Sequence, residues 1–161
     1  MLCYFVAATD YVTDAERYGW SIVQRTVLAY DVVNGADWRH PDGEHEALTH
    51  LPVTQVSYHG AQAYCKWAGT RLPTYEEYWR WTKKDARPVI EKDVQMYPVA
   101  AVNLGGNVWE ITTTENVWGE IRLAGGSFLC NDRTCDGTSV DRVLQVDKIT
   151  GNYHISFVVL D

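Results

Sequence analysis

Apolar residues fall into short runs along the chain, separated by polar and glycine-rich stretches. The first run, residues 1–8, predicts a short helix. Thr13 and Glu16 then show the T-x-x-E spacing of a capping box, in which both side chains accept backbone N–H groups at a helix start. Residues 31–50 are polar and rich in turn-forming types, so they predict a long surface loop.

The middle of the chain carries the clearest helix signals. Residues 51–69 predict a strand that enters a helix, with Ser57 as the N-cap and Gly69 as the natural stop. Thr74 and Glu77 repeat the capping-box spacing and predict the start of a further helix.

The second half of the chain shows weaker patterns. One short strand is expected near residues 96–102, and short apolar runs at 109–112 and 120–123 stand among glycines. Residues 155–161 predict a strand that is apolar enough to lie at the centre of a sheet. Few regular elements and many loops together predict an irregular α+β fold, built as a single domain over residues 1–161.

Composition narrows the classes of partner. Hydrophobic residues make up 46% and charged residues 22% of the chain, which is typical of a folded globular protein. A net charge of −7 without any Lys/Arg run disfavours nucleic acid, and no apolar run is long enough to span a membrane. The many Trp and Tyr residues indicate a core with irregular walls or a pocket lined by rings. Trp38 is the best candidate for a pocket wall, because it stands in the polar loop.

The four cysteines are Cys3, Cys65, Cys130 and Cys135. They are too few to build a disulfide scaffold, and the first residues lack the features of a secretory leader, so a cytoplasmic setting is favoured. Cys130 and Cys135 form a C-x4-C pair behind a Gly-Gly-Ser turn. Two thiolates suit a soft ion such as Cu(I), whereas zinc would require four ligands. The spacing alone leaves a local disulfide and two inert thiols open as alternatives.

Five motifs occur in the order in which one known family carries them. They are YVTDAERYGWSIV at 11–23, GADWRHPDG at 35–43, LPVTQVSYHGAQAYCKWAGTRLPTYEEYWRW at 51–81, NLGGNVWE at 103–110 and GGSFLCNDRTC at 125–135. By these motifs the chain resembles the formylglycine-generating enzyme family, the sulfatase-modifying domains related to C-type lectins. The resemblance implies an irregular, C-type-lectin-like α+β fold.

The resemblance also implies a chemistry for the cysteine pair. In the family, the cysteines that match Cys130 and Cys135 bind Cu(I), a substrate cysteine joins them, and molecular oxygen converts that cysteine into an aldehyde, formylglycine. Ser127 matches the family's active-site serine, which would contact an oxygen species or orient the substrate thiol, although a turn serine is the simpler interpretation. Asn131 is expected to contact the substrate backbone, and Trp38 to wall the pocket. The expected partners are a cysteine-containing peptide or a small thiol, and oxygen.

NLGGNVWE matches a calcium-binding turn of the family. Carried over by position, the calcium ligands would be Asn103, Gly106, Val108 and Glu110, which offer the oxygen donors that Ca²⁺ prefers. The alternative is a glycine turn without metal, in which Glu110 caps neighbouring amides.

Other parts of the chain depart from the family. The stretch between Trp81 and Asn103 is shorter, and the elements that follow the second cysteine in the family have no clear match. These departures favour an alternative function, a non-catalytic binding module or a copper-thiolate protein on the same scaffold. Cys65 is predicted to be a buried free thiol. The histidines show no zinc or iron spacing, and a short domain with open walls suggests a homo-oligomer.

Overall fold

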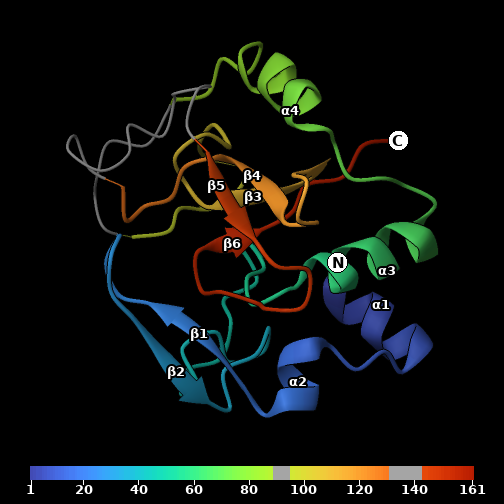
Figure 1. Cartoon of the computed structure of the whole chain (residues 1–161), viewed down its shortest axis with the longest axis vertical. Coiled ribbons are helices and arrows are strands. Elements are labelled where there is room, and N and C mark those ends of the chain that lie inside the picture. The colour runs from blue at the N-terminus through green and yellow to red at the C-terminus, as the bar shows by residue number, and fades with distance from the viewer. Residues whose placement is uncertain (89–94, 131–142) are drawn as a thin grey trace.

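The computed structural model describes residues 1–88, 95–130 and 143–161. Its helices are α1 (Leu2–Thr9), α2 (Asp14–Tyr18), α3 (Tyr58–Ala68) and α4 (Tyr75–Thr82); its strands are β1 (Trp20–Gln24), β2 (Tyr30–Asn34), β3 (Trp109–Glu115), β4 (Ile121–Gly125), β5 (Leu144–Val146) and β6 (Ile155–Ser156). The mixture of helices and sheet confirms the predicted α+β class (Figure 1).

Both predicted capping boxes are present. The Thr13 N–H donates to Glu16 Oε2 at 2.8 Å, and the Glu16 N–H donates to Thr13 Oγ1 at 3.4 Å. At the start of α4, the Thr74 N–H donates to Glu77 Oε2 at 2.9 Å and the Glu77 N–H donates back to Thr74 Oγ1 at 3.2 Å. Each box satisfies amide donors that a helix start leaves without an intrahelical partner.

Helix α3 also begins and ends as its sequence predicts. Ser57 Oγ accepts the Gly60 N–H at 3.1 Å, and Gly69 ends the helix with a left-handed φ of 70°. Its Cys65 is a buried free thiol, as expected, and burial raises the pKa of that thiol.

The strands form two separate sheets. The first pairs β1 and β2 antiparallel, and the second has the order β5-β4-β3-β6. In the second sheet, β3 and β4 run antiparallel, while β6 pairs with β3 in parallel. The apolar runs at 109–112 and 120–123 therefore lie in neighbouring strands. Of the predicted strand at 155–161, only the two residues of β6 join the sheet, and they lie at its edge instead of its centre. Leu160 makes an isolated bridge to Arg71.

Three further predictions of secondary structure were wrong. Residues 31–34 belong to β2 and not to a loop, because β1 supplies a pairing partner. Residues 51–56 form no strand. There Gln55 is fully buried with a φ of 62°, and its side-chain amide donates to the carbonyls of Ile22 and Pro41. These contacts hold the segment in a bent path against β1.

The strand expected at 96–102 is absent from that described segment. The backbone of this segment forms hydrogen bonds with the side chain of Asn107 instead of with a neighbouring strand. The Tyr97 N–H donates to Asn107 Oδ1 at 3.0 Å, and Asn107 Nδ2 donates to the Tyr97 carbonyl at 3.0 Å. Asn107 thus pairs with one residue as a strand would, but it cannot extend the ladder.

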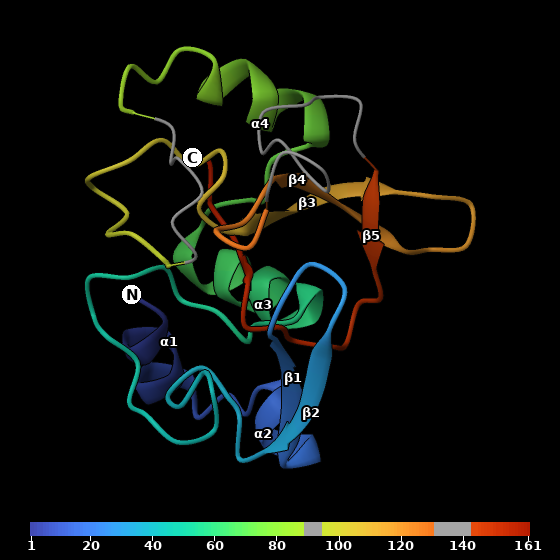
Figure 2. The ribbon, with the colours of Figure 1, turned by 90° about the vertical axis from the view of Figure 1, so that its left-hand side faces the viewer.

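Apolar side chains pack on both faces of the larger sheet. Figure 2 shows α4 on one side of β3 and β4, with α3 on the other. The larger core joins α1 and α3 to the sheet through side chains such as Phe5, Tyr64 and Ile111. The smaller core joins α4 to the sheet through Tyr78 and Ala124. Among the described residues, no helix has the length and apolar character needed to cross a membrane.

The contact between α4 and β4 leads to a stability prediction. Gly125 has a φ of 84°, and an added Cβ would lie 2.5 Å from Tyr78 Oη, so Gly125→Ala combines backbone strain with a steric clash. We expect it to lower the free energy of unfolding by about 3 kcal/mol, measured by urea denaturation. Gly119→Ala is the matched control, because Gly119 has a φ of 79° and nothing within 4 Å of an added Cβ. It should cost about 1 kcal/mol. Equal losses in the two variants would contradict the clash.

Candidate functional site

Cys130 lies at the end of a tight turn that begins at Ser127. The Cys130 N–H donates to the Ser127 carbonyl at 2.8 Å, and the Ser127 N–H donates to Cys130 Sγ at 3.3 Å. The Ser127 hydroxyl oxygen also accepts the Leu129 N–H at 3.3 Å. Cys130 is buried and disulfide-bonded in the structure. These bonds fix where the Cys130 sulfur points.

Two neighbouring segments hold this turn in place. The Phe128 N–H donates to the Asn107 carbonyl at 2.8 Å, which ties the turn to the NLGGNVWE segment. On its other side, Ser127 Oγ lies 3.3 Å from His154 Nδ1. Strand β6 brings His154 to this place, because the Trp109 N–H donates to the His154 carbonyl at 2.9 Å where β6 pairs with β3.

Sequence reasoning missed His154. The side chain is buried, and burial lowers its pKa to about 4, so the ring is neutral at physiological pH. A lone histidine in a turn carries no motif, and its contact with Ser127 spans 27 positions of the chain. The sole available signal was that His154 directly precedes the apolar residues of the last predicted strand.

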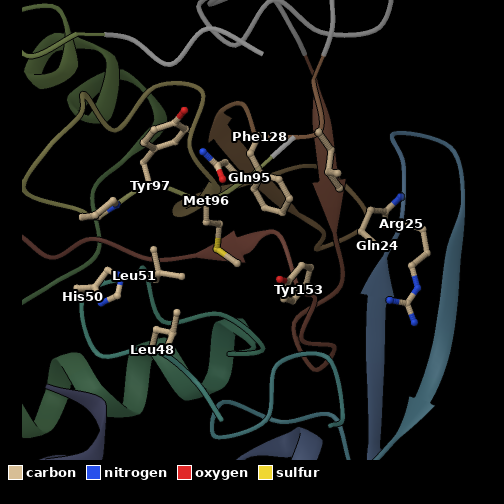
Figure 3. A pocket seen from close by; sticks show the side chains of 12 residues that line it. Gln24, Arg25, Leu48, His50, Leu51, Gln95, Met96, Tyr97, Phe128 and Tyr153 are labelled. Carbon is tan, nitrogen blue, oxygen red and sulfur yellow. The ribbon is translucent and has the colours of Figure 1, made fainter. Parts of the chain in front are cut away.

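A cavity of about 700 Å³ adjoins the Cys130 turn (Figure 3). Phe128 and Leu129, the two residues before Cys130, form part of its wall. The other lining residues are Gln24, Arg25, Leu48, His50, Leu51, Gln95, Met96, Tyr97, Pro98 and Tyr153. The Phe128 and Tyr153 rings meet edge to face, with centroids 5.9 Å apart. Aromatic and apolar walls with a few polar groups suit a site for a small molecule or a peptide side chain.

One predicted site residue, Trp38, lies away from this cavity, and two others are outside the described residues. Trp38 is half-buried and packs against the larger core, with the Arg39 guanidinium 4.1 Å from the centre of its ring, and it does not line this cavity. Asn131 and Cys135 lie outside the described residues, so their predicted roles stay predictions.

The predicted calcium turn is buried throughout. Asn103 Nδ2 donates to the carbonyls of Thr82 and Asp85, and Asn103 Oδ1 accepts the Gly105 N–H at 2.9 Å. Gly106 has a φ of 91°, a left-handed conformation that favours glycine. These contacts give Asn103 a structural role, while its side-chain oxygen keeps a further lone pair for a cation.

The Glu110 carboxylate is buried at the end of this turn. The residue is 2% exposed, and its Oε2 has no hydrogen-bond partner among the described residues. Burial raises the pKa of Glu110 well above its ordinary value of 4.5. The predicted capping of neighbouring amides by Glu110 does not occur at Oε2. A buried carboxylate oxygen without a donor fits a cation better than it fits a metal-free turn.

The described residues contain no group of three or more His, Cys, Asp and Glu side chains placed to hold a metal. That finding does not decide either predicted metal site. The predicted calcium ligands are mainly amide and carbonyl oxygens, and the predicted copper ligands include Cys135, which is outside the described part of the chain.

The fold and the Cys130 turn define an α+β protein with a buried sulfur site beside a cavity. A sequence match to the family described as "Sulfatase-modifying factor enzyme 1-like domain" covers residues 2–83, half of the 161-residue chain. The chain therefore belongs to the sulfatase-modifying factor enzyme 1-like family. The matched stretch ends before the NLGGNVWE turn and before Cys130.

Curated relatives agree with this assignment. The chain is 40% identical over 93 residues to the formylglycine-generating enzyme of Mus musculus, and 42% identical over 92 residues to that of Thermomonospora curvata. It is 34% identical over 93 residues to the inactive C-alpha-formylglycine-generating enzyme 2 of Bos taurus. Each match covers 46% of this chain, and 25%, 30% and 31% of the respective relative. The chain thus matches about a quarter to a third of the length of these relatives, one of which is named inactive.

Proposed function

We propose that this protein oxidises a thiol, a cysteine in a peptide or protein, to formylglycine with molecular oxygen and Cu(I). Family membership and the names of its relatives support the reaction class. The observation that carries the proposal is the Cys130 turn, in which Cys130 is buried and the two residues before it, Phe128 and Leu129, line a cavity. A C-type-lectin-like arrangement of the chain is part of the same proposal.

Thiolate ligands make this site suitable for Cu(I). Soft sulfur donors select Cu(I), and Cys130 with Cys135 would supply two of them once the Cys130 disulfide is reduced. Bound Cu(I) would supply the capacity to activate oxygen. Converting a CH₂SH group to CHO with one O₂ consumes two electrons and two protons and releases H₂S and H₂O. The reaction therefore needs an added thiol reductant as the electron source.

The chain's own residues orient and shield the reacting thiol. The Ser127 N–H donates to Cys130 Sγ, and such a bond favours the thiolate, which is the form that binds metal. The cavity beside Phe128 and Leu129 would bind the residues that flank a substrate cysteine. The burial of Cys130 limits the access of water to the sulfur.

The test is turnover of a cysteine-containing peptide. The protein is reduced, loaded with Cu(I) and incubated with peptide, oxygen and a thiol reductant. We expect oxygen uptake and an aldehyde product detected by mass spectrometry, both dependent on added copper. Saturable peptide binding with no oxygen uptake at any copper loading would rule out the oxidase.

We also propose that Ca²⁺ binds at Asn103, Gly106, Val108 and Glu110. The buried Glu110 Oε2 has no partner in the part of the chain that the structure describes, and this supports the ligand set, because a bound cation would compensate the buried carboxylate. Calcium would then act as a structural ion that holds the NLGGNVWE segment, which in turn supports the Cys130 turn through the Asn107 carbonyl.

A non-catalytic binding module is the second candidate function. It is favoured by the relative of Bos taurus that is named inactive and matches the same share of this chain as the enzymes do. In that case the cavity would bind a peptide without chemistry. Peptide affinity that is the same with and without Cu(I), in the absence of any aldehyde product, would favour this module.

A further inference from the structure

We infer that His154 is a positioning residue for Cys130: its Nδ1 accepts the Ser127 hydroxyl proton and thereby holds the Ser127–Cys130 turn in place. This inference rests on the proposed role of Cys130 and names a residue of this chain that supports it. His154 itself does not contact Cys130 in the described contacts, so it acts through Ser127.

The direction of the hydrogen bond follows from the neighbours of Ser127. Its hydroxyl oxygen accepts the Leu129 N–H at 3.3 Å, and the hydroxyl proton then needs an acceptor. Among the described residues, His154 Nδ1 at 3.3 Å is the acceptor in reach. Both side chains are buried, with 2% and 7% exposure, so water does not readily replace this bond.

The protonation state of the ring agrees with this direction. Burial lowers the pKa of His154 to about 4, so the imidazole is neutral and has one nitrogen able to accept. With Nδ1 as the acceptor, the ring proton is on Nε2. A charged imidazolium would have no acceptor, and it would face the Ser127 hydroxyl with a donor.

Backbone hydrogen bonds fix the position of His154 beside the turn. Its backbone carbonyl accepts the Trp109 N–H at 2.9 Å, and its own N–H donates to Asn152 Oδ1 at 3.4 Å. The ring is therefore attached to the β3–β6 pair, at the edge of the sheet. Ser127 connects this rigid part to Cys130 in two ways, through the Cys130 N–H and through its own N–H to the sulfur.

The stability of this turn can be measured by amide hydrogen exchange of the full chain, without added metal or substrate. In His154→Phe, a ring of similar size without an acceptor, the Cys130 amide should exchange about 3- to 10-fold faster, as expected for one lost hydrogen bond. In His154→Asn, whose side-chain oxygen can accept near the same place, the rate should stay within about twofold of wild type. The Thr113 amide, bonded to the Pro73 carbonyl away from the turn, is the internal control and should not change.

Two further measurements separate positioning from a general packing role. Ser127→Ala should accelerate Cys130 exchange as much as His154→Phe does, and the double variant should show no additional effect. Nitrogen-15 NMR of wild type should show an unprotonated Nδ1 on His154, with a resonance that shifts in Ser127→Ala. After reduction, Cu(I) affinity should fall about 3- to 10-fold in His154→Phe and be retained in His154→Asn.

Four results would each overturn the inference. The Cys130 amide could exchange at the wild-type rate in His154→Phe, or equally fast in His154→Asn and His154→Phe. The effects of His154→Phe and Ser127→Ala could add in the double variant, or Nδ1 of His154 could be protonated. If His154→Phe does not fold, the inference is tested by Cys130 exchange in Ser127→Ala and by the nitrogen-15 spectrum of wild type. Because exchange and NMR need neither copper nor turnover, a wild type that binds no copper would reject the proposed oxidase and leave this inference to be judged separately.

Discussion

Cys130→Ser and Cys135→Ser should each abolish Cu(I) binding and reduce copper-dependent turnover by about a hundredfold or more. Loss of a partner in the outer shell of a metal site already costs 10–100-fold, and loss of one of two thiolate ligands removes half of the coordination. Binding is measured by competition with a chromophoric Cu(I) chelator on reduced protein, and turnover by oxygen uptake with a cysteine peptide.

Cys3→Ser is the matched control, because Cys3 is an exposed free thiol. It should bind copper as wild type does. Trypsin cleaves after Arg133 and so places Cys130 and Cys135 on different peptides, which allows the redox state of each thiol to be followed during reduction. A wild type that binds no more Cu(I) than the two ligand variants would contradict the copper site.

Glu110→Gln should remove a calcium-dependent gain in thermal stability. Saturating Ca²⁺ at about 100 times its Kd stabilises a native state by about 2.7 kcal/mol, so the Tm of wild type should rise by about 5–10 °C. The neutral amide offers a weaker ligand, and the Tm of the variant should change little with calcium. Differential scanning calorimetry with Ca²⁺ and with a chelator measures both.

The pH dependence of the metal-free protein provides an independent check. Burial raises the pKa of Glu110 in the folded state above its ordinary value of 4.5, so the folded state binds this proton more tightly than the unfolded state. The associated stability is fully present below pH 4.5 and is lost as pH rises towards the folded pKa. Without calcium, wild type should therefore lose stability as the pH rises above 4.5, and Glu110→Gln should lose less.

Glu76→Gln is the control for these two experiments, because Glu76 is an exposed glutamate in the first turn of α4. It removes the same formal charge without touching the buried carboxylate. It should keep both the calcium response and the pH response of wild type. A wild type whose Tm does not respond to calcium at any concentration would reject the calcium site.

Local sequence signals predicted the helices well. The capping boxes at Thr13 and Thr74, the N-cap at Ser57 and the stop at Gly69 all depend on contacts within a few residues, so the sequence contains the complete information for each. The strands were predicted poorly. Strand β2 forms because β1 is available to pair with it, and the segment at 96–102 bonds to the side chain of Asn107 instead of a strand.

The residues of the candidate sites were likewise predicted where a local motif marks them and missed where only a distant contact does. Motif positions placed Cys130, Ser127 and Glu110 in two candidate sites. The structure describes all three and brings Cys130 and Ser127 into one turn. It also added His154 and the cavity beside Phe128, and placed Trp38 against the core. Cys135 and Asn131 lie outside the described residues and remain predictions from the sequence.

The sequence by itself determined the family, the four helix starts or stops at its caps, and the identity of the sulfur and oxygen donors, because these depend on residue type and short spacing. The tertiary structure alone decided which of those donors are buried without a partner among the described residues, as at Glu110 Oε2, and which distant side chain lies beside Ser127 in the Cys130 turn. Burial and contacts across 27 positions arise from packing of β6 against β3, and no local pattern in the chain specifies that packing.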